Sequence, residues 1–205
     1  TRGMSSAASD VYKRQKYEPV ANKAEYYAVK YLPGKNYMDF RNWVMENQEK
    51  VLNKTDVYDN FDIALFQPQF GTDLTQFDAV FLGLWPNATE MFAGMEYWAK
   101  NGGEQNAKVP VKTVQAVDTW QWAVSAPEGD PDIGVVRFSD CKMKDGVNAN
   151  QVFDALKDFA IAAKETGDNL GRKMIFPGSG GTEGDYDYVY SCLLYTSDAA
   201  DDIPR

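Results

Sequence analysis

The alternation of apolar and polar residues predicts strands and helices in a fixed order through the first half of the chain. Four runs have the two-residue period of a strand: about Tyr26–Leu32, Asp62–Phe66, Phe77–Trp85 and Val111–Val124. Two runs place apolar residues at the spacing of an amphipathic helix: Tyr37–Val51 and Thr89–Lys100. The predicted order is β-α-β-β-α-β, which is the split βαβ or ferredoxin-like unit.

Asparagine marks the start of three predicted helices. Each of these asparagines stands three residues before an acidic or amide side chain, in the pairs Asn36 with Asp39, Asn87 with Glu90, and Asn148 with Gln151. An asparagine in this position accepts a hydrogen bond from a backbone N–H of the first turn, and the later side chain can bond back to the cap. We therefore expect a helix to begin directly after each asparagine.

The second half of the chain repeats the pattern of the first. The stretches EYYAVKYLPGK (25–35), NYMDFRNWVMENQEKVL (36–52), IALFQPQFG (63–71) and FDAVF (77–81) have counterparts in the same order, about 110 residues later. The counterparts are GVVRFSDCKMK (134–144), NANQVFDALKDFAIAAK (148–164), RKMIFPGSGG (172–181) and YDYVY (186–190). We expect a complete repeat over residues 24–125, a linker over 126–132, and a second repeat over 133–191 that is truncated after its third strand.

The tandem order of elements resembles the dimeric α/β-barrel superfamily, in which two ferredoxin-like sheets face one another and close a barrel. The resemblance covers most of residues 24–190 and rests on element order and apolar pattern. It implies an α+β fold whose two halves form an intrachain pseudo-dimer barrel. The run FDAVFLGLWPNATEMFAGMEYW (77–98) is also similar to a family of uncharacterised marine bacterial proteins.

Both ends of the chain resemble translated sequencing adapters. The stretches concerned are SSAASDVYKRQ (5–15) and CLLYTSDAADDIPR (192–205), so residues 1–15 and 192–205 are interpreted as artefacts. The truncated second repeat would then lack a helix and a strand, and its uncovered sheet edge would favour self-association. The alternative is that both ends are genuine disordered tails, which their composition also fits.

Charge and hydropathy exclude two classes of partner. The chain carries 21 basic and 30 acidic residues, a net charge of −9, and no basic cluster, which excludes nucleic acid as an expected partner. No apolar run approaches the ~20 residues of a membrane span. With Cys192 assigned to an artefact, Cys141 is the one remaining cysteine, which excludes an intrachain disulfide and is compatible with a periplasmic, secreted or cytoplasmic location.

The chain contains no histidine, and this restricts its chemistry. Catalytic triads that use histidine, histidine-bound zinc and haem with a proximal histidine are excluded within this sequence, and we expect no cofactor and no metal. Proton transfer would fall to carboxylates, Lys, Tyr or Cys. The weak catalytic candidates are Asp140 and Cys141, since Arg137 and Lys142 could stabilise a thiolate. We favour the simpler interpretation that both are ordinary residues at a strand end.

A glycine-rich run, GSGG (178–181), resembles a phosphate-binding loop at first sight. Such loops depend on the N-terminus of a following helix. This run stands between two predicted strands instead, where glycine supplies turn conformations. We therefore predict a hairpin turn.

Aromatic residues form the most informative candidate site. The predicted ligand-binding residues are Tyr27, Tyr31, Trp85, Trp120 and Trp122, accompanied by Phe66 and Phe176. Large rings that leave space between them form an apolar pocket with a few polar tips, the usual form of a small-molecule site. The alternative is plain core packing.

Two functions follow from these residues. The first is a small-ligand-binding or interaction protein with an aromatic-lined cavity for a small apolar molecule and no catalytic site. The alternative is a cofactor-independent oxygenase or isomerase, in which Tyr27, Trp85 and Trp120 would position the substrate and Asp140 or Cys141 would transfer protons. A titratable side chain inside a cavity would favour the enzyme, and a solid aromatic core would favour the binding or structural role.

Overall fold

A mixed α+β architecture built on an antiparallel sheet is seen in the computed structural model, which describes residues 16–71, 73–128, 134–180 and 186–195. The elements are β1 (Ala21–Tyr31), α1 (Tyr37–Lys50), the 3₁₀ turns η2 (Leu52–Lys54) and η3 (Asp56–Tyr58), β2 (Asp62–Phe66), β3 (Ala79–Trp85), α2 (Ala88–Asn101), α3 (Gly103–Asn106), β4 (Val111–Ser125), β5 (Gly134–Cys141), α4 (Ala149–Glu165), β6 (Gly171–Pro177) and β7 (Tyr188–Tyr195). Within these residues the sheet has seven strands in the order β2-β3-β1-β4-β6-β7-β5.

The chain divides into two compact units. Residues 21–122 and 175–188 form one, which we call the β1–β4 unit. Residues 123–174, with 16–20 and 189–195, form the described part of the other, which we call the α4 unit. Each unit therefore draws on separate stretches of the chain.

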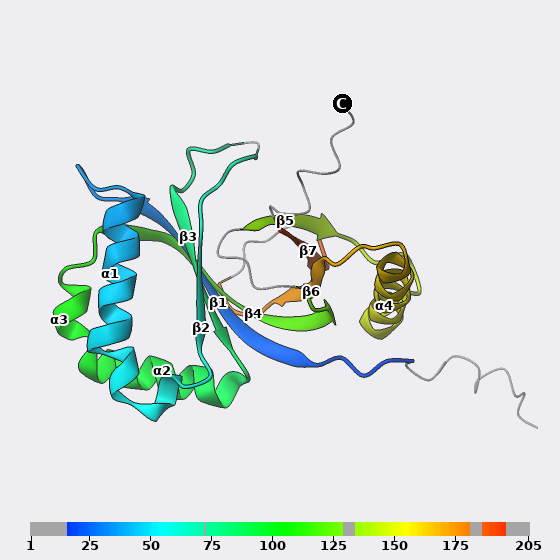
Figure 1. The fold of residues 1–205 in the computed structure, drawn as a ribbon, viewed down its shortest axis with the longest axis horizontal. Helices are drawn as coiled ribbons and strands as arrows, with labels where there is room; N and C mark the ends of the chain where they lie inside the picture. Colours follow the sequence, from blue (N-terminus) through cyan, green and yellow to red (C-terminus); the bar gives the residue numbers. More distant parts are fainter. Residues whose placement is uncertain (1–15, 72, 129–133, 181–185, 196–205) are drawn as a thin grey trace, which may run out of the picture. The chain divides into compact units, whose positions relative to one another are not determined.

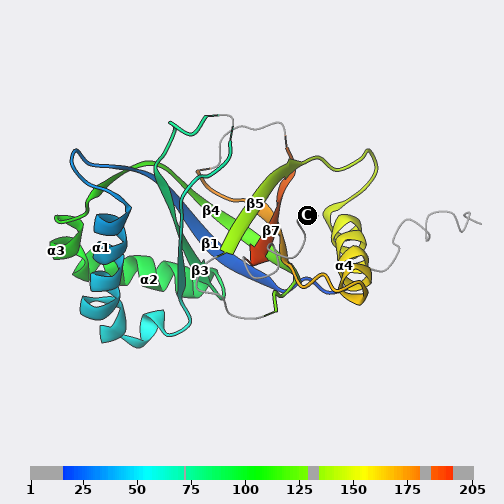
Figure 2. The same cartoon turned by 45° about the horizontal axis from the view of Figure 1, so that its top comes forward.

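The β1–β4 unit has the predicted β-α-β-β-α-β order. Strand β1 pairs antiparallel with β3 and β4, and β2 pairs antiparallel with β3, which gives the neighbour order β2-β3-β1-β4. Tyr27, for example, lies opposite Phe81 on one side and Ala116 on the other. Helices α1 and α2 cover one face of these four strands (Figures 1 and 2). This is the ferredoxin-like arrangement expected for the first repeat.

The observed elements depart from the predicted boundaries mainly at the start of two strands. Strand β1 begins at Ala21 rather than near Tyr26, because the polar Lys23 is buried there and pairs with Trp85 and Trp120 on its two neighbours. Strand β3 begins at Ala79 rather than Phe77.

All three asparagine caps are confirmed. Asn36 accepts hydrogen bonds from the backbone N–H of Met38 and Asp39, and the Asp39 carboxylate accepts one from the backbone N–H of Asn36. Asn148 forms the same reciprocal box with Gln151 at the start of α4. Asn87 accepts from the backbone N–H of Glu90 at 3.0 Å. Local side-chain chemistry therefore fixes where these helices begin.

In the second half of the chain the elements follow in the order β5, α4, β6 and β7, and the α4 unit contains β5, α4 and parts of β6 and β7. Its helix buries Phe153 and Ala160. Strand β7 continues through Cys192 to Tyr195, past the residue at which the second repeat was expected to end. Residues 1–15 and 196–205 lie outside the described residues, as do most of the linker and Gly181. The artefact interpretation of the two ends stays a prediction.

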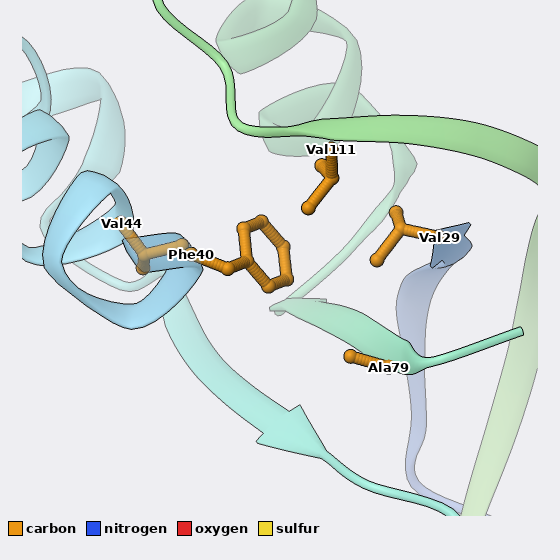
Figure 3. Packing of buried hydrophobic residues seen from close by; sticks show 5 residues of the cluster. All are labelled: Val29, Phe40, Val44, Ala79 and Val111. Atoms are coloured by element: carbon orange, nitrogen blue, oxygen red, sulfur yellow. The ribbon is translucent and has the colours of Figure 1, made fainter. Parts of the chain in front are cut away.

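Two clusters of buried side chains lie on the helix-covered side of the β1–β4 unit. Figure 3 shows the first, in which Phe40 of α1 points between the strands toward Val29 and Val111. The second contains Val51, Leu52, Tyr58, Trp85 and Met91. No helix in the described part of the chain is long and apolar enough to cross a membrane.

Candidate functional site: a helix–sheet cavity

A cavity of about 350 Å³ lies in the β1–β4 unit, between the sheet and its helices. Both buried clusters contribute to its wall, which is largely apolar and aromatic. Exposed residues of the lining, Met95, Asn106 and Thr113, connect it to the surface. Its size falls within the roughly 300–1,000 Å³ range of small-molecule sites.

Glu25 provides the charge on the sheet side of this cavity. The Tyr27 hydroxyl donates a hydrogen bond to Glu25 Oε2 at 2.8 Å, and Trp85 Nε1 donates to Oε1 at 3.1 Å. Burial raises the pKa of Glu25, and these two hydrogen bonds offset part of that rise. The carboxyl group is therefore oriented by two donors and poorly solvated.

Two glycines make room for this arrangement. Gly83 lies opposite Glu25 in the register, and a Cβ atom there would stand 2.9 Å from Glu25 Oε1 and 2.7 Å from the ring of Phe61. A Cβ atom at Gly94 would stand 2.0 Å from the ring of Trp85. Any side chain at either position would push against the cavity wall.

The aromatic part of the wall is held in place by ring contacts. Phe61 and Trp85 have centroids 4.1 Å apart, and Tyr58 lies 5.5 Å from each. The Tyr58 hydroxyl donates to the backbone oxygen of Gly94 at 2.6 Å, and burial raises the pKa of Tyr58 to about 12. Burial and the charge of Glu25 likewise raise the pKa of Tyr27. Both hydroxyls thus remain protonated donors at neutral pH.

Asn47 provides an amide on the helix side of the cavity. It is only 4% exposed and belongs to the lining. Neither its Nδ2 nor its Oδ1 has a hydrogen-bond partner among the described residues. A buried amide without a partner costs about 1–3 kcal/mol, so a group that enters the cavity and bonds to Asn47 would recover that free energy.

The predicted aromatic residues are only partly brought together. Tyr27 and Trp85 lie in the cavity wall. Tyr31 packs against the cluster of Val29 and Phe40 outside the lining. Trp120 is 41% exposed with Lys23 Nζ 4.8 Å from its ring, and Trp122 packs against Phe176 at 4.8 Å. Trp120 lies opposite Lys23 and Trp122 lies opposite Ala21, and neither of these β1 residues lines the cavity.

The predicted catalytic candidates lie in the α4 unit and do not line this cavity. Asp140 and Cys141 end strand β5, and the Cys141 thiol donates to the backbone oxygen of Ser139 at 3.4 Å. The described ranges contain no group of three or more acidic or cysteine side chains that could hold a metal ion. The described part of the GSGG run follows β6, and Gly180 there has a φ of +78°.

Sequence reasoning missed Glu25 and Asn47. The signal for Glu25 was available, because it alternates with Tyr27 and Val29 and therefore faces the same side of β1. Asn47 falls at the edge of the apolar stripe of α1, where a polar residue ordinarily meets solvent. Only the packing of the helix on the sheet reveals its burial.

No family model matches the chain, and neither does any curated protein. Among solved structures, the fold is similar to a mutant chlorite dismutase from Candidatus Nitrospira defluvii, with a TM-score of 0.49 and 8% identity over 89% of this chain and 80% of that chain. It is also similar to chlorite dismutase from the same organism in complex with imidazole, with a TM-score of 0.46 and 8% identity over 90% of this chain and 80% of that chain. A heme-binding protein from Thermus thermophilus has a TM-score of 0.45 and 11% identity, over 87% of this chain and 82% of that chain. Similarity at this level concerns the course of the backbone and assigns no residue a role.

Proposed function

We propose that this protein binds a small, mainly apolar molecule in the helix–sheet cavity of the β1–β4 unit. The observation that carries the proposal is Asn47, a buried amide without a partner in the described residues that faces an aromatic-lined cavity. Buried polar groups are almost always hydrogen-bonded. An unpaired amide at a cavity wall is the arrangement expected of a site that a ligand completes.

The wall also supports a ligand with a flat apolar body. Phe61, Trp85 and Tyr58 present ring surfaces, and their mutual contacts keep them from collapsing into the space. The sequence contains no histidine, so the ligand proposed is not a haem held by a histidine.

The test uses 2-naphthylmethanol, a neutral two-ring alcohol, added to the full chain and followed by protein-observed NMR. We expect saturable binding that perturbs cavity residues such as Asn47 and Trp98. Substitution Thr113→Trp at the cavity mouth should weaken binding about tenfold or more, because Thr113 is exposed and its substitution blocks access without disturbing the core. The matched control is Gln115→Trp, exposed on the same strand outside the lining. Absence of saturable binding up to the solubility limit would overturn the proposal.

An isomerase is the second candidate, and one observation favours it. Glu25 is a titratable side chain on the cavity wall with a raised pKa, which is what a general acid–base requires. In that case Glu25, rather than Asp140 or Cys141, would transfer the proton. Loss of turnover in Glu25→Gln with retained binding of the alcohol would support this role.

We also propose that the two halves of the chain are tandem copies of one plan, as the sequence predicts. The neighbour order β6-β7-β5 in the second half corresponds to β2-β3-β1 in the first, and each half begins strand, helix, strand, strand. An experimental structure in which β1-α1-β2-β3 and β5-α4-β6-β7 do not superpose would contradict this duplication and leave the cavity unaffected.

A further inference from the structure

We propose that the ligand of the cavity is an organic amine bound as its cation, with Glu25 as the counter-charge. This inference rests on the proposed function and specifies its ligand class. Glu25 is the one charged side chain in the described lining, which contains no lysine and no arginine. None of the ion pairs of the described residues involves it.

The carboxyl group retains capacity for a cationic partner. A carboxylate offers about four acceptor positions, and the hydrogen bonds from Tyr27 and Trp85 use one on each oxygen. These two donors fix the direction of the group. A buried carboxylate without a cation is costly to ionise, and a nearby ammonium group offsets part of that cost by favouring the ionised form.

The rings beside Glu25 suit the same cation. Trp85 and Tyr27 both donate a hydrogen bond to the carboxyl group, and the Phe61 ring packs against that of Trp85 at an interplanar angle of 31°. Aromatic faces attract ammonium groups, most strongly where water is excluded. An anionic ligand would meet Glu25 as a like charge, and a neutral ligand would leave it unpaired.

The charged groups described next to Glu25 on the sheet do not neutralise its charge. On β1, Lys23 lies two residues away on the same face and is paired with Asp118. On β4, Asp118 is opposite Glu25 in the register and is itself an acid. On β3 the opposite residue is Gly83. In the described lining the other titratable groups are Tyr58 and Tyr27, and burial raises the pKa of both so that they stay neutral.

The experiment compares two probes of nearly the same shape on the full chain, 2-naphthylmethylamine and 2-naphthylmethanol, by isothermal titration calorimetry at neutral pH. We expect the amine to bind about tenfold or more tightly than the alcohol. In Glu25→Gln this preference should fall to about one, because glutamine lacks the charge, although its oxygen can still accept from Trp85 Nε1 and its amide can donate to the Tyr27 hydroxyl oxygen. Glu165→Gln, an exposed position at the end of α4, removes the same charge elsewhere and should leave the preference intact.

A second measurement needs no variant. As the pH is lowered toward the raised pKa of Glu25, amine binding should release protons from this carboxyl group. The affinity for the amine should fall over the same range, while the affinity for the alcohol stays constant. Titrations in buffers of different ionisation enthalpy measure this release. Binding of the alcohol with no preference for the amine, or a preference that survives in Glu25→Gln, would overturn the inference alone. Failure of both probes to bind would overturn the proposed function as well.

Discussion

Asn47 illustrates how one residue can serve a site at the expense of the fold. Its neighbours on the buried side of α1, Phe40 and Val44, are apolar and pack onto the sheet. An amide in this stripe gives up its hydration, and no described group returns the hydrogen bonds. A residue chosen for stability alone would be apolar here, since an unpaired buried amide is among the costlier features of a core.

Substitution Asn47→Leu should therefore stabilise the protein and impair its site. Leucine has a similar size and no polar atoms, so we expect the free energy of unfolding to rise by about 1–3 kcal/mol. Affinity for 2-naphthylmethanol should fall because the amide contact is lost. Urea unfolding monitored by circular dichroism checks the first effect and calorimetry the second. A loss of stability instead would mean that Asn47 has a structural partner, and the main support for the proposed site would disappear.

At the scale of elements, the sequence predicted most where the determinants are local. The caps Asn36, Asn87 and Asn148 lie beside the helices they begin, so their effect can be read without the fold. The start of β1 could not be read in this way, because the polar stretch around Lys23 becomes a strand through pairing with β3 and β4, which are distant in sequence. Tertiary pairing overrides local polarity there. The separation of Trp120 from Trp85 also depends on tertiary pairing. Both lie opposite Lys23, but on β4 and β3, the two different neighbours of β1.

The turn after β6 depends on a contact that its glycines alone do not reveal. The backbone N–H of Gly178 donates to the backbone oxygen of Asp118 at 2.7 Å, and the N–H of Asp118 donates to the oxygen of Ser179 at 3.0 Å. These bonds fasten the turn to β4. A Cβ atom at Gly180 would then stand 2.2 Å from the backbone oxygen of Ala116.

Gly180→Ala should accordingly be much more harmful than a matched glycine substitution. Gly34 and Gly180 have nearly the same φ, +77° and +78°, but a Cβ atom at Gly34 would meet nothing within 4 Å. Alanine at Gly34 should lower the free energy of unfolding by about 1–2 kcal/mol, the cost of a left-handed backbone conformation for a residue with a side chain. Alanine at Gly180 should cost a further 1–3 kcal/mol, roughly the overpacking range, because backbone must move. Equal losses in urea unfolding would contradict the close approach of the turn to β4.

At the scale of the whole molecule, the described residues of each unit include a buried cation beside an aspartate. Lys23, 5% exposed, pairs with Asp118 in the β1–β4 unit, and Arg172, 4% exposed, pairs with Asp168 in the α4 unit. Burial alone would raise the pKa of both aspartates, but hydrogen bonds from the cations and from backbone N–H groups outweigh it and hold each pKa below the ordinary 3.8. The stability these pairs contribute is present above pH 3.8 and is lost as the pH falls through the lowered values.

Glu25 has the opposite effect, because it lowers the stability of the folded state as the pH rises. Its pKa in the folded protein lies above the ordinary 4.5, so the folded state holds a proton that the unfolded chain has released, and stability falls as the pH rises from 4.5 through the raised value. Self-repulsion from a net charge of −9 at neutral pH acts in the same direction. We therefore expect the free energy of unfolding to be greatest at mildly acidic pH, above the range in which the two aspartates titrate and below the range in which Glu25 does.

Urea unfolding at a series of pH values, in enough salt to screen exposed ion pairs, measures this profile. Glu25→Gln should flatten the decline toward neutral pH and change little below pH 4.5, where the carboxyl group is protonated in both states. Asp118→Asn should lower stability at neutral pH and flatten the decline in acid, because the Lys23 pair is then absent at every pH. A wild-type profile that rises steadily to neutral pH would show that Glu25 is well solvated, and the cavity would then lack the poorly hydrated carboxyl group on which amine recognition depends.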